Sequence, residues 1–154
     1  MRILVLSDIH SRGSVAEAII AKHTDIQHIF FLGDGINHIE DFACFFPEKV
    51  FHSVSGNCDF SSFAPGAAFE ELGGKKILYT HGHSYNVKWS LARLKSDAEA
   101  KGADLVLYGH THIAKEEYED GRYFINPGAV TGSPASYAII DISSSGIMPN
   151  IINI

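Results

Sequence analysis

Two histidines one residue apart, His110 and His112, end an apolar run that begins at Leu105. The run is short and rich in strand-forming residues, so it predicts a buried strand that ends in a tight loop, with Gly109 allowing the turn. Two imidazole side chains on one loop can bind metal ions, or they can be unrelated polar residues at a sheet edge. A single His-x-His pair does not decide between these two interpretations.

The same arrangement, an apolar strand followed by side chains that can bind metals, occurs five times along the chain. The side chains are, in chain order, Asp8 and His10, then Asp34, then Asn57, then His81, and finally His110 and His112. The carboxyl ends of parallel strands lie along one edge of a sheet, where open α/β folds place their ligands. We therefore expect these side chains to meet in space.

The chemistry of this set indicates which ligand it would take. Carboxylate, imidazole and amide oxygen without thiolate suit divalent Mn, Fe, Zn, Ni or Co, and they argue against a structural zinc site. Seven ligands are too many for one ion in an open catalytic site, but they suit two ions that share a bridging ligand. Two ions roughly 3.5–4 Å apart can bind both the attacking and the leaving oxygen of a displacement at phosphorus.

Length and composition limit the alternatives. The 154 residues, 45% of them hydrophobic, are enough for the core of one domain spanning residues 1–154. The net charge is −6 and the basic residues form no cluster, so we expect no nucleic-acid partner. No segment approaches the ~20 apolar residues that span a bilayer, and we expect no membrane association. The N-terminal apolar run is too short for a secretory signal, and Cys44 and Cys58 lack disulfide or metal spacing, which favours a cytoplasmic location.

Alternating apolar runs and helical patterns predict an α/β fold with two packed mixed β-sheets flanked by helices. Strands are expected at 2–6, 29–32, 50–54, 67–72, 75–80, 105–108, 117–119, 122–124, 137–142 and 147–154. Helices are expected after a Ser14–Glu17 capping box, over 36–45, and over 87–98 with Gly102 as the stop. Trp89 and the phenylalanines are expected in the core, and Cys44 beside them.

The five motifs also carry a resemblance to a known family. They occur here as Asp8–His10, Gly33-Asp34, Gly56-Asn57, His81-Gly82 and Gly109–His112. In this order, each after a strand, they resemble the calcineurin-like metallophosphoesterase superfamily. The small size, Gly-Asn-Cys-Asp in place of Gly-Asn-His, and the turn Asn126-Pro127-Gly128 are similar to its compact YfcE-type phosphodiesterase branch.

The resemblance implies a role for each residue. Asp8, His10 and His112 would hold one divalent ion, and Asn57, His81 and His110 the other, with Asp34 bridging the two. Manganese is the preferred metal, and Ni, Zn, Fe or Co are alternatives. Asp34, Asn57 and His81 would act with a hydroxide shared by both ions, which attacks the phosphorus of a small phosphate ester. The expected function is that of a binuclear metal-dependent phosphodiesterase, and homo-oligomerisation stays open.

One position departs from the family pattern. Many relatives carry a histidine directly after Gly-Asn, where this chain has Cys58, and a thiol is a poor general acid for a leaving oxygen. We therefore expect a preference for phosphodiesters or for esters with good leaving groups. His83 is a weaker candidate for a partial substitute at the rim of the site. Asp59 is expected to orient a ligand or to cap a helix, and the first role is favoured.

Other interpretations predict different behaviour. A catalytically weak scaffold or protein-binding module of the same fold, like the retromer subunit, would bind protein partners, although here every ligand position is filled. An amidohydrolase barrel also uses His-x-His, but such barrels need ~250 residues. His23, His28, His38 and His52 lie in no motif and are expected to be ordinary surface or core histidines.

Overall fold

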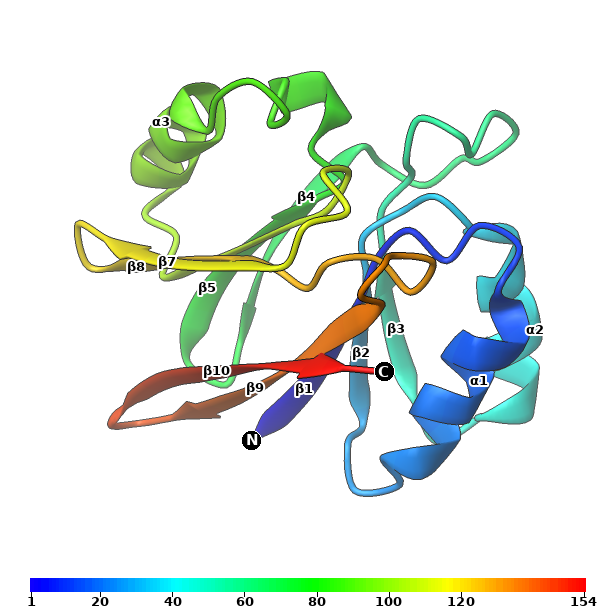
Figure 1. The fold of residues 1–154 in the computed structure, drawn as a ribbon. Helices are drawn as coiled ribbons and strands as arrows, with labels where there is room; N and C mark the ends of the chain where they lie inside the picture. The colour runs from blue at the N-terminus through cyan, green and yellow to red at the C-terminus, as the bar shows by residue number, and fades with distance from the viewer.

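Two five-stranded sheets form the centre of the molecule in the computed structural model, which describes residues 1–154 (Figure 1). The first sheet has the strand order β10-β9-β1-β2-β3, from β1 (Arg2–Leu6), β2 (His28–Phe31), β3 (Val50–Ser53), β9 (Ser136–Ser143) and β10 (Gly146–Asn153). The second has the order β4-β5-β6-β8-β7, from β4 (Ala67–Leu72), β5 (Lys75–Thr80), β6 (Leu105–Tyr108), β7 (Lys115–Glu119) and β8 (Arg122–Asn126). Both sheets are mixed, which confirms the predicted fold class.

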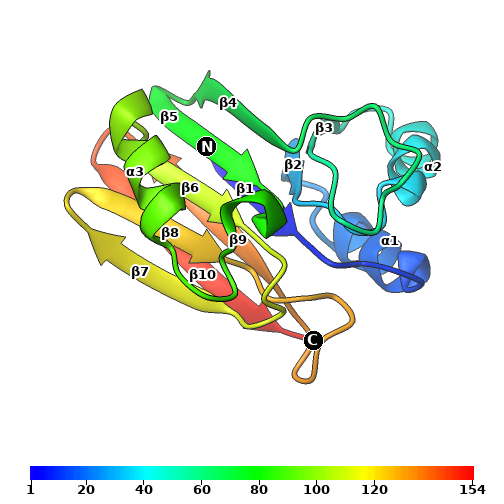
Figure 2. The same cartoon turned by 90° about the horizontal axis from the view of Figure 1, so that it is seen from above.

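Each sheet contains three neighbouring strands that run parallel, and this places the loops that follow them at one end. In the first sheet β1 pairs with β2 and β2 with β3 in parallel, and in the second β5 pairs with β6 and β6 with β8. The antiparallel strands, β9 and β10, β4, and β7, lie toward the edges. Seen from above, the central strands of the second sheet run side by side beneath α3 (Figure 2).

Three apolar layers hold the sheets and helices together. The layer between the sheets contains Ile3, Val5 and Phe30 from the first sheet and Leu105 and Leu107 from the second. The helices α1 (Gly13–Lys22) and α2 (Asn37–Phe45) cover the outer face of the first sheet, and α3 (Ala92–Lys101) covers the second. Strands buried on both faces explain the continuous apolar runs in the sequence. None of the helices is long and apolar enough to span a lipid bilayer.

Two helix starts differ from the prediction. Helix α1 begins at Gly13 after Arg12, and no side chain caps it, so the Ser14–Glu17 capping box is wrong. The helix expected from residue 87 begins at Ala92, because Asn86 has a left-handed backbone (φ 57°) and Val87 closes a turn onto the Gly82 carbonyl. A short 3₁₀ turn at His83–Tyr85 precedes it.

Several residues expected in the core lie on the surface. Trp89, Phe60 and Phe63 are almost fully exposed, and Phe45 and Cys44 are exposed as well. Helix α2 buries only Phe42, and a residue two positions later points about 200° away around the helix, so Cys44 faces solvent. Residue type alone was a poor guide here, because apolar atoms contribute much of any protein surface.

Candidate metal site

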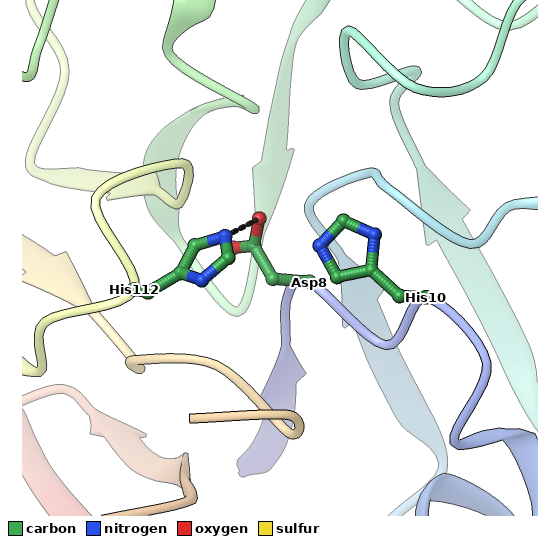
Figure 3. Close-up of side chains that lie close together, drawn as sticks. All are labelled: Asp8, His10 and His112. Carbon is green, nitrogen blue, oxygen red and sulfur yellow. Dashed lines mark ion pairs between the residues drawn. The ribbon is translucent and has the colours of Figure 1, made fainter. Parts of the chain in front are cut away.

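The loop after β1 supplies Asp8 and His10 (Figure 3). Asp8 is fully buried, and its Oδ2 accepts hydrogen bonds from Ser7 Oγ at 2.6 Å and from the His110 backbone N–H at 3.1 Å. Its Oδ1 is buried, accepts no hydrogen bond and lies 3.0 Å from His112 Nε2. His10 flanks Asp8 on the side opposite His112. The loop after β1, from the first sheet, therefore meets the loop after β6, from the second sheet.

Asp34 lies between the two predicted groups of ligands. Its Oδ1 accepts a hydrogen bond of 2.7 Å from the Cys58 N–H. Its Oδ2 is 3.5 Å from His81 Nε2 and 3.9 Å from His10 Nε2, and the carboxylate is buried. One oxygen thus faces histidines from both sheets.

The hydrogen bond to a carbonyl fixes the tautomer of His81. His81 Nδ1 lies 2.7 Å from the Leu32 carbonyl oxygen, and because a carbonyl only accepts, Nδ1 holds the proton. In the neutral ring Nε2 then has a free lone pair. That lone pair faces Asn57 Oδ1 and His110 Nδ1, both at 3.1 Å. An outer carbonyl that orients the ring in this way is typical of a histidine that binds a metal.

The histidine at the start of the last loop, His110, is neutral at pH 7. Burial and the neighbouring His81 ring lower the pKa of His110 to about 4. A neutral imidazole keeps a lone pair available for a cation.

The structure brings all seven predicted ligands into one cluster. Side-chain ligand atoms of Asp8, His10 and His112 lie within 4.8 Å of one another, and so do those of Asp8, Asp34 and His81. Asn57 and His110 join the cluster through His81. No lysine or arginine forms an ion pair with Asp8 or Asp34. Buried carboxylates and inward-facing lone pairs without a cationic side chain are a chemically suitable site for divalent ions.

The backbone of these loops is strained. Seven residues other than glycine have positive φ angles, and five of them are predicted ligands: Asp8, His10, Asp34, His110 and His112, with φ between 47° and 68°. Such conformations are uncommon outside glycine and concentrate at functional sites. The surrounding contacts therefore hold these side chains in place against the backbone preference.

Two glycines allow the loops to approach each other closely. A Cβ on Gly56 would lie 2.1 Å from Asp34 Oδ1, and one on Gly109 would lie 2.0 Å from Ser7 Oγ. Larger residues at these positions would displace the carboxylates of Asp34 and Asp8. The glycine beside each motif is thus part of the packing of the site.

Asp59 orients the Asp34 loop, as the sequence predicted. Its carboxylate accepts hydrogen bonds of 2.8–3.1 Å from the backbone N–H groups of Asp34, Gly35, Ile36 and Gly56. Burial alone would raise the pKa of this carboxyl, but the four donors outweigh it and hold the pKa below its ordinary value.

Asn126 has a similar role that the sequence did not reveal. Its Nδ2 donates 3.0 Å hydrogen bonds to the Gly109 carbonyl and to Thr111 Oγ1, and its Oδ1 accepts one from the Gly128 N–H. The fully buried amide therefore ties the loop of His110 and His112 to the turn after β8. The only sequence signal was the Asn-Pro-Gly turn, which predicts a change of direction and no partner.

Cys58 and His83 border the cluster. Cys58 Sγ lies within 4.8 Å of ligand atoms of His10 and Asp34. The pKa of Cys58 is raised, first because the thiol loses hydration and second because the Asp34 carboxylate lies beside it. The thiol therefore keeps its proton at pH 7. The His83 ring is centred 5.3 Å from the His81 ring, its Nδ1 is buried without a partner, and burial lowers the pKa of His83. His83 thus lies beside the cluster, where the sequence placed it.

Comparison with known sequences identifies relatives over nearly the whole chain. Residues 1–145 match the family model of the calcineurin-like phosphoesterase superfamily domain. The probable metallophosphoesterase YsnB of Bacillus subtilis is 31% identical over 149 residues, which cover 94% of this chain and 86% of YsnB. The phosphodiesterase YfcE of Escherichia coli is 28% identical, over 92% of this chain and 88% of YfcE.

Solved structures show the same fold. A predicted phosphoesterase from Streptococcus pneumoniae superposes with a TM-score of 0.85 at 26% identity, over 99% of this chain and 88% of that one. Vps29 of Entamoeba histolytica, solved with Zn²⁺, superposes with a TM-score of 0.77 at 21% identity, over 99% of both chains. The second likeness shows the fold alone.

Proposed function

Because this chain belongs to the calcineurin-like phosphoesterase superfamily, we propose that it is a metal-dependent phosphodiesterase with two divalent ions in the cluster described above. The observation that carries the proposal is the convergence on one space of two buried carboxylates, neither paired with a lysine or arginine, and several imidazole nitrogens. Such a space is unfavourable unless positive charge enters it. Two divalent ions would also reduce the repulsion between an anionic ester and a protein of net charge −6.

Each group of ligands has its own part in the proposal. Asp8, His10 and His112 would hold one ion, and Asn57, His81 and His110 the second. Asp34 would contact both, because its Oδ2 faces histidines from the two groups. When bound, the ions would supply positive charge to the phosphoryl oxygens and lower the pKa of a water molecule to about 7. Manganese is the preferred metal.

The protein's own proton donors favour activated esters. Cys58 occupies the position next to Asn57, and its raised pKa makes the thiol a weak acid toward a leaving alkoxide. His83 has a lowered pKa and is largely neutral at pH 7, so it too is a weak proton donor there. We therefore expect faster hydrolysis of phosphodiesters with phenolic leaving groups than of alkyl phosphomonoesters.

A metal titration with an activated substrate tests this proposal. Protein stripped with a chelator is reloaded with Mn²⁺, Ni²⁺ or Zn²⁺ and assayed on bis(p-nitrophenyl) phosphate, p-nitrophenyl phosphate and an alkyl monoester. We expect about two bound ions per chain and activity that the chelator removes. Asp34→Asn should lower kcat roughly 10³-fold, the equivalent of about 4 kcal/mol of transition-state stabilisation.

Asp25→Asn is the matched control. This exposed carboxylate pairs with Arg2 at the start of β1, and the cluster lies beyond the other end of that strand. It should leave both the metal content and kcat unchanged. Equal activity of wild type and Asp34→Asn, or full activity in the presence of chelator, would overturn the proposal.

A non-catalytic scaffold is the second candidate, and the likeness to Vps29 favours it. A scaffold would bind a protein partner and would not hydrolyse activated diesters, whichever metal it is loaded with. The complete set of seven ligand side chains in one cluster supports the enzyme instead. Metal-loaded protein without any turnover of bis(p-nitrophenyl) phosphate would favour the scaffold.

A further inference from the structure

A cavity of about 690 Å³ lies beside the metal cluster, between the loop that follows β3 and helix α2. Its apolar lining includes Ile36, Ile39, Phe60, Phe63 and Ala64. Its volume is within the range of pockets that bind small organic ligands. The cavity is therefore large enough for the organic part of a substrate.

Two residues of the cavity lining adjoin the cluster. Cys58 and Asp59 line the cavity, and Cys58 Sγ lies within 4.8 Å of ligand atoms of His10 and Asp34. Asp59 binds the backbone of the Asp34 loop through its carboxylate. An ester whose phosphoryl group lies at the cluster would thus have the cavity directly beside it, with Cys58 at the boundary.

Two aromatic rings that line the cavity are largely exposed to solvent. Phe60 and Phe63 are exposed by 92% and 105% of their reference surface, the two most exposed large apolar side chains in the chain. Aromatic rings that face a cavity can stack on a flat ligand, and such stacking does not require a specific base or ring.

The polar lining limits the charge of the ligand. The cavity contains Glu40 and Asp59 but no lysine, arginine or histidine, and its other polar groups are neutral: Asn37, Ser53, Ser61 and Ser62. A second phosphate or a carboxylate would meet repulsion there. An uncharged ring with hydrogen-bonding groups would find donors in the serine hydroxyls and an acceptor in Glu40.

We propose that this cavity binds the uncharged aromatic part of a phosphodiester, a group of nucleoside size that stacks on Phe60 and Phe63. The inference rests on the proposed function, since it assigns the substrate class of that same site. With a p-nitrophenyl leaving group, which needs no proton from Cys58, it predicts that selectivity comes from the ester group that stays on the phosphorus.

Two esters with the same leaving group test this assignment. Mn²⁺-loaded protein is assayed with thymidine 5′-(p-nitrophenyl) phosphate and with ethyl p-nitrophenyl phosphate. We expect kcat/KM to be about 10-fold or more higher for the thymidine ester. Phe60→Ala and Phe63→Ala should each lower this ratio roughly 5-fold or more, mainly through KM for the thymidine ester.

Phe45→Ala is the matched control, because Phe45 is an exposed phenylalanine at the other end of α2 and does not line the cavity. It should leave the ratio unchanged. A ratio near one in the wild type, or a ratio that the Phe60 and Phe63 variants do not change, overturns the assignment while hydrolysis itself stands. A shift in oligomeric state with either variant at an unchanged ratio also overturns it, and it identifies the face as a contact between copies.

A binding measurement separates this inference from the proposed function. Zn²⁺-loaded protein with ¹³C-labelled phenylalanine is titrated with thymidine and followed by NMR. Shifts of the Phe60 and Phe63 ring signals, with Phe45 unaffected, support the cavity even if neither ester is hydrolysed. Absence of these shifts at millimolar thymidine contradicts it even if both esters are hydrolysed.

Discussion

The loops of the metal cluster and the turns of the three hairpins both contain residues with left-handed backbone, but they place different side chains there. At the hairpin turns these positions are Gly73, Gly74, Asp120, Gly121 and Gly146. In the cluster they are mostly aspartates and histidines, with φ angles of 47° to 68°. Glycine accepts this conformation at little cost, whereas other residues pay roughly 1 kcal/mol or more each. The hairpin turns therefore carry little backbone strain, whereas the cluster keeps strained side chains in place.

The charges of the two regions differ in the same way. Beside the β7–β8 hairpin Lys95 and Lys115 form ion pairs with Glu117 and Glu119. In the cluster the carboxylates of Asp8 and Asp34 lie beside imidazole rings and form no ion pair with a lysine or arginine. The carboxylates of the first region are paired with lysines of the chain, whereas those of the second have no lysine or arginine partner, which agrees with the proposed binding of divalent ions.

The largest expected effect on stability is that of the metal. Mn²⁺ at 100 times its dissociation constant should raise the free energy of unfolding by about 2.7 kcal/mol for each ion bound, because it binds only the folded cluster. Urea unfolding with and without metal measures the gain. The Asp34→Asn variant should show little of it, and an equal gain in that variant would contradict the assigned site.

Removal of the Asp59 carboxylate should have the next largest effect. Asp59→Ala leaves four N–H groups without their acceptor, and we expect a loss of about 2 kcal/mol at pH 7. The pKa of Asp59 is lowered in the folded state, so its contribution is present above the ordinary pKa of 3.8 and is lost as the pH falls through the lower folded value. The free energies of unfolding of wild type and Asp59→Ala, measured with urea, should therefore differ at pH 7 and approach each other in acid, with Asp25→Ala as the control.

Backbone strain should give a smaller effect, which favours glycine over alanine at the left-handed positions of both regions. His10→Gly and His10→Ala both remove the imidazole, but only glycine tolerates the φ of 47°. In the presence of chelator, His10→Gly should be more stable than His10→Ala by about 1 kcal/mol. In the β7–β8 turn, Gly121→Ala at φ 79° should lose about 1 kcal/mol. An alanine variant at position 10 as stable as the glycine variant would show that this loop is not strained.

The smallest effect concerns the paired charges of the hairpin. Hydrogen bonds from Lys115 and Lys95 lower the pKa of Glu117 to about 2. Because the folded pKa is depressed, the stabilisation is present above the ordinary value of 4.5 and is lost as the pH falls toward 2. Glu117→Gln should cost at most about 0.5 kcal/mol at pH 7, since such partly exposed pairs contribute little. Thermal unfolding at low and high salt checks it, and a loss that salt does not reduce would contradict an ionic origin.

The sequence motifs predicted the residues of the site better than residue type predicted which side chains are exposed. Strand ends that carry Asp, Asn and His were sufficient to nominate the seven residues that the structure brings together, because parallel strands place their carboxyl ends together. The positions of Trp89, Phe60 and Phe63 were wrong, because an apolar side chain is buried only if a neighbouring layer covers it. Periodicity gave the wrong start for α3, because the left-handed residue Asn86 interrupts the helical pattern before it can begin.

The sequence by itself determined the order of strands and helices, the type of ligand atoms and the family, because each is written in local periodicity and in short motifs. Only the tertiary structure decided that His81 Nε2 faces Asn57 and His110, that Asn126 holds the loop of His110 and His112, and that a cavity with two exposed phenylalanines lies beside Cys58. Contacts in the cluster join residues that are far apart in the sequence. Asn126 and Thr111 are 15 positions apart, and His110 and Asp8 are 102. Their geometry depends on how the two sheets pack, and no local pattern specifies that packing.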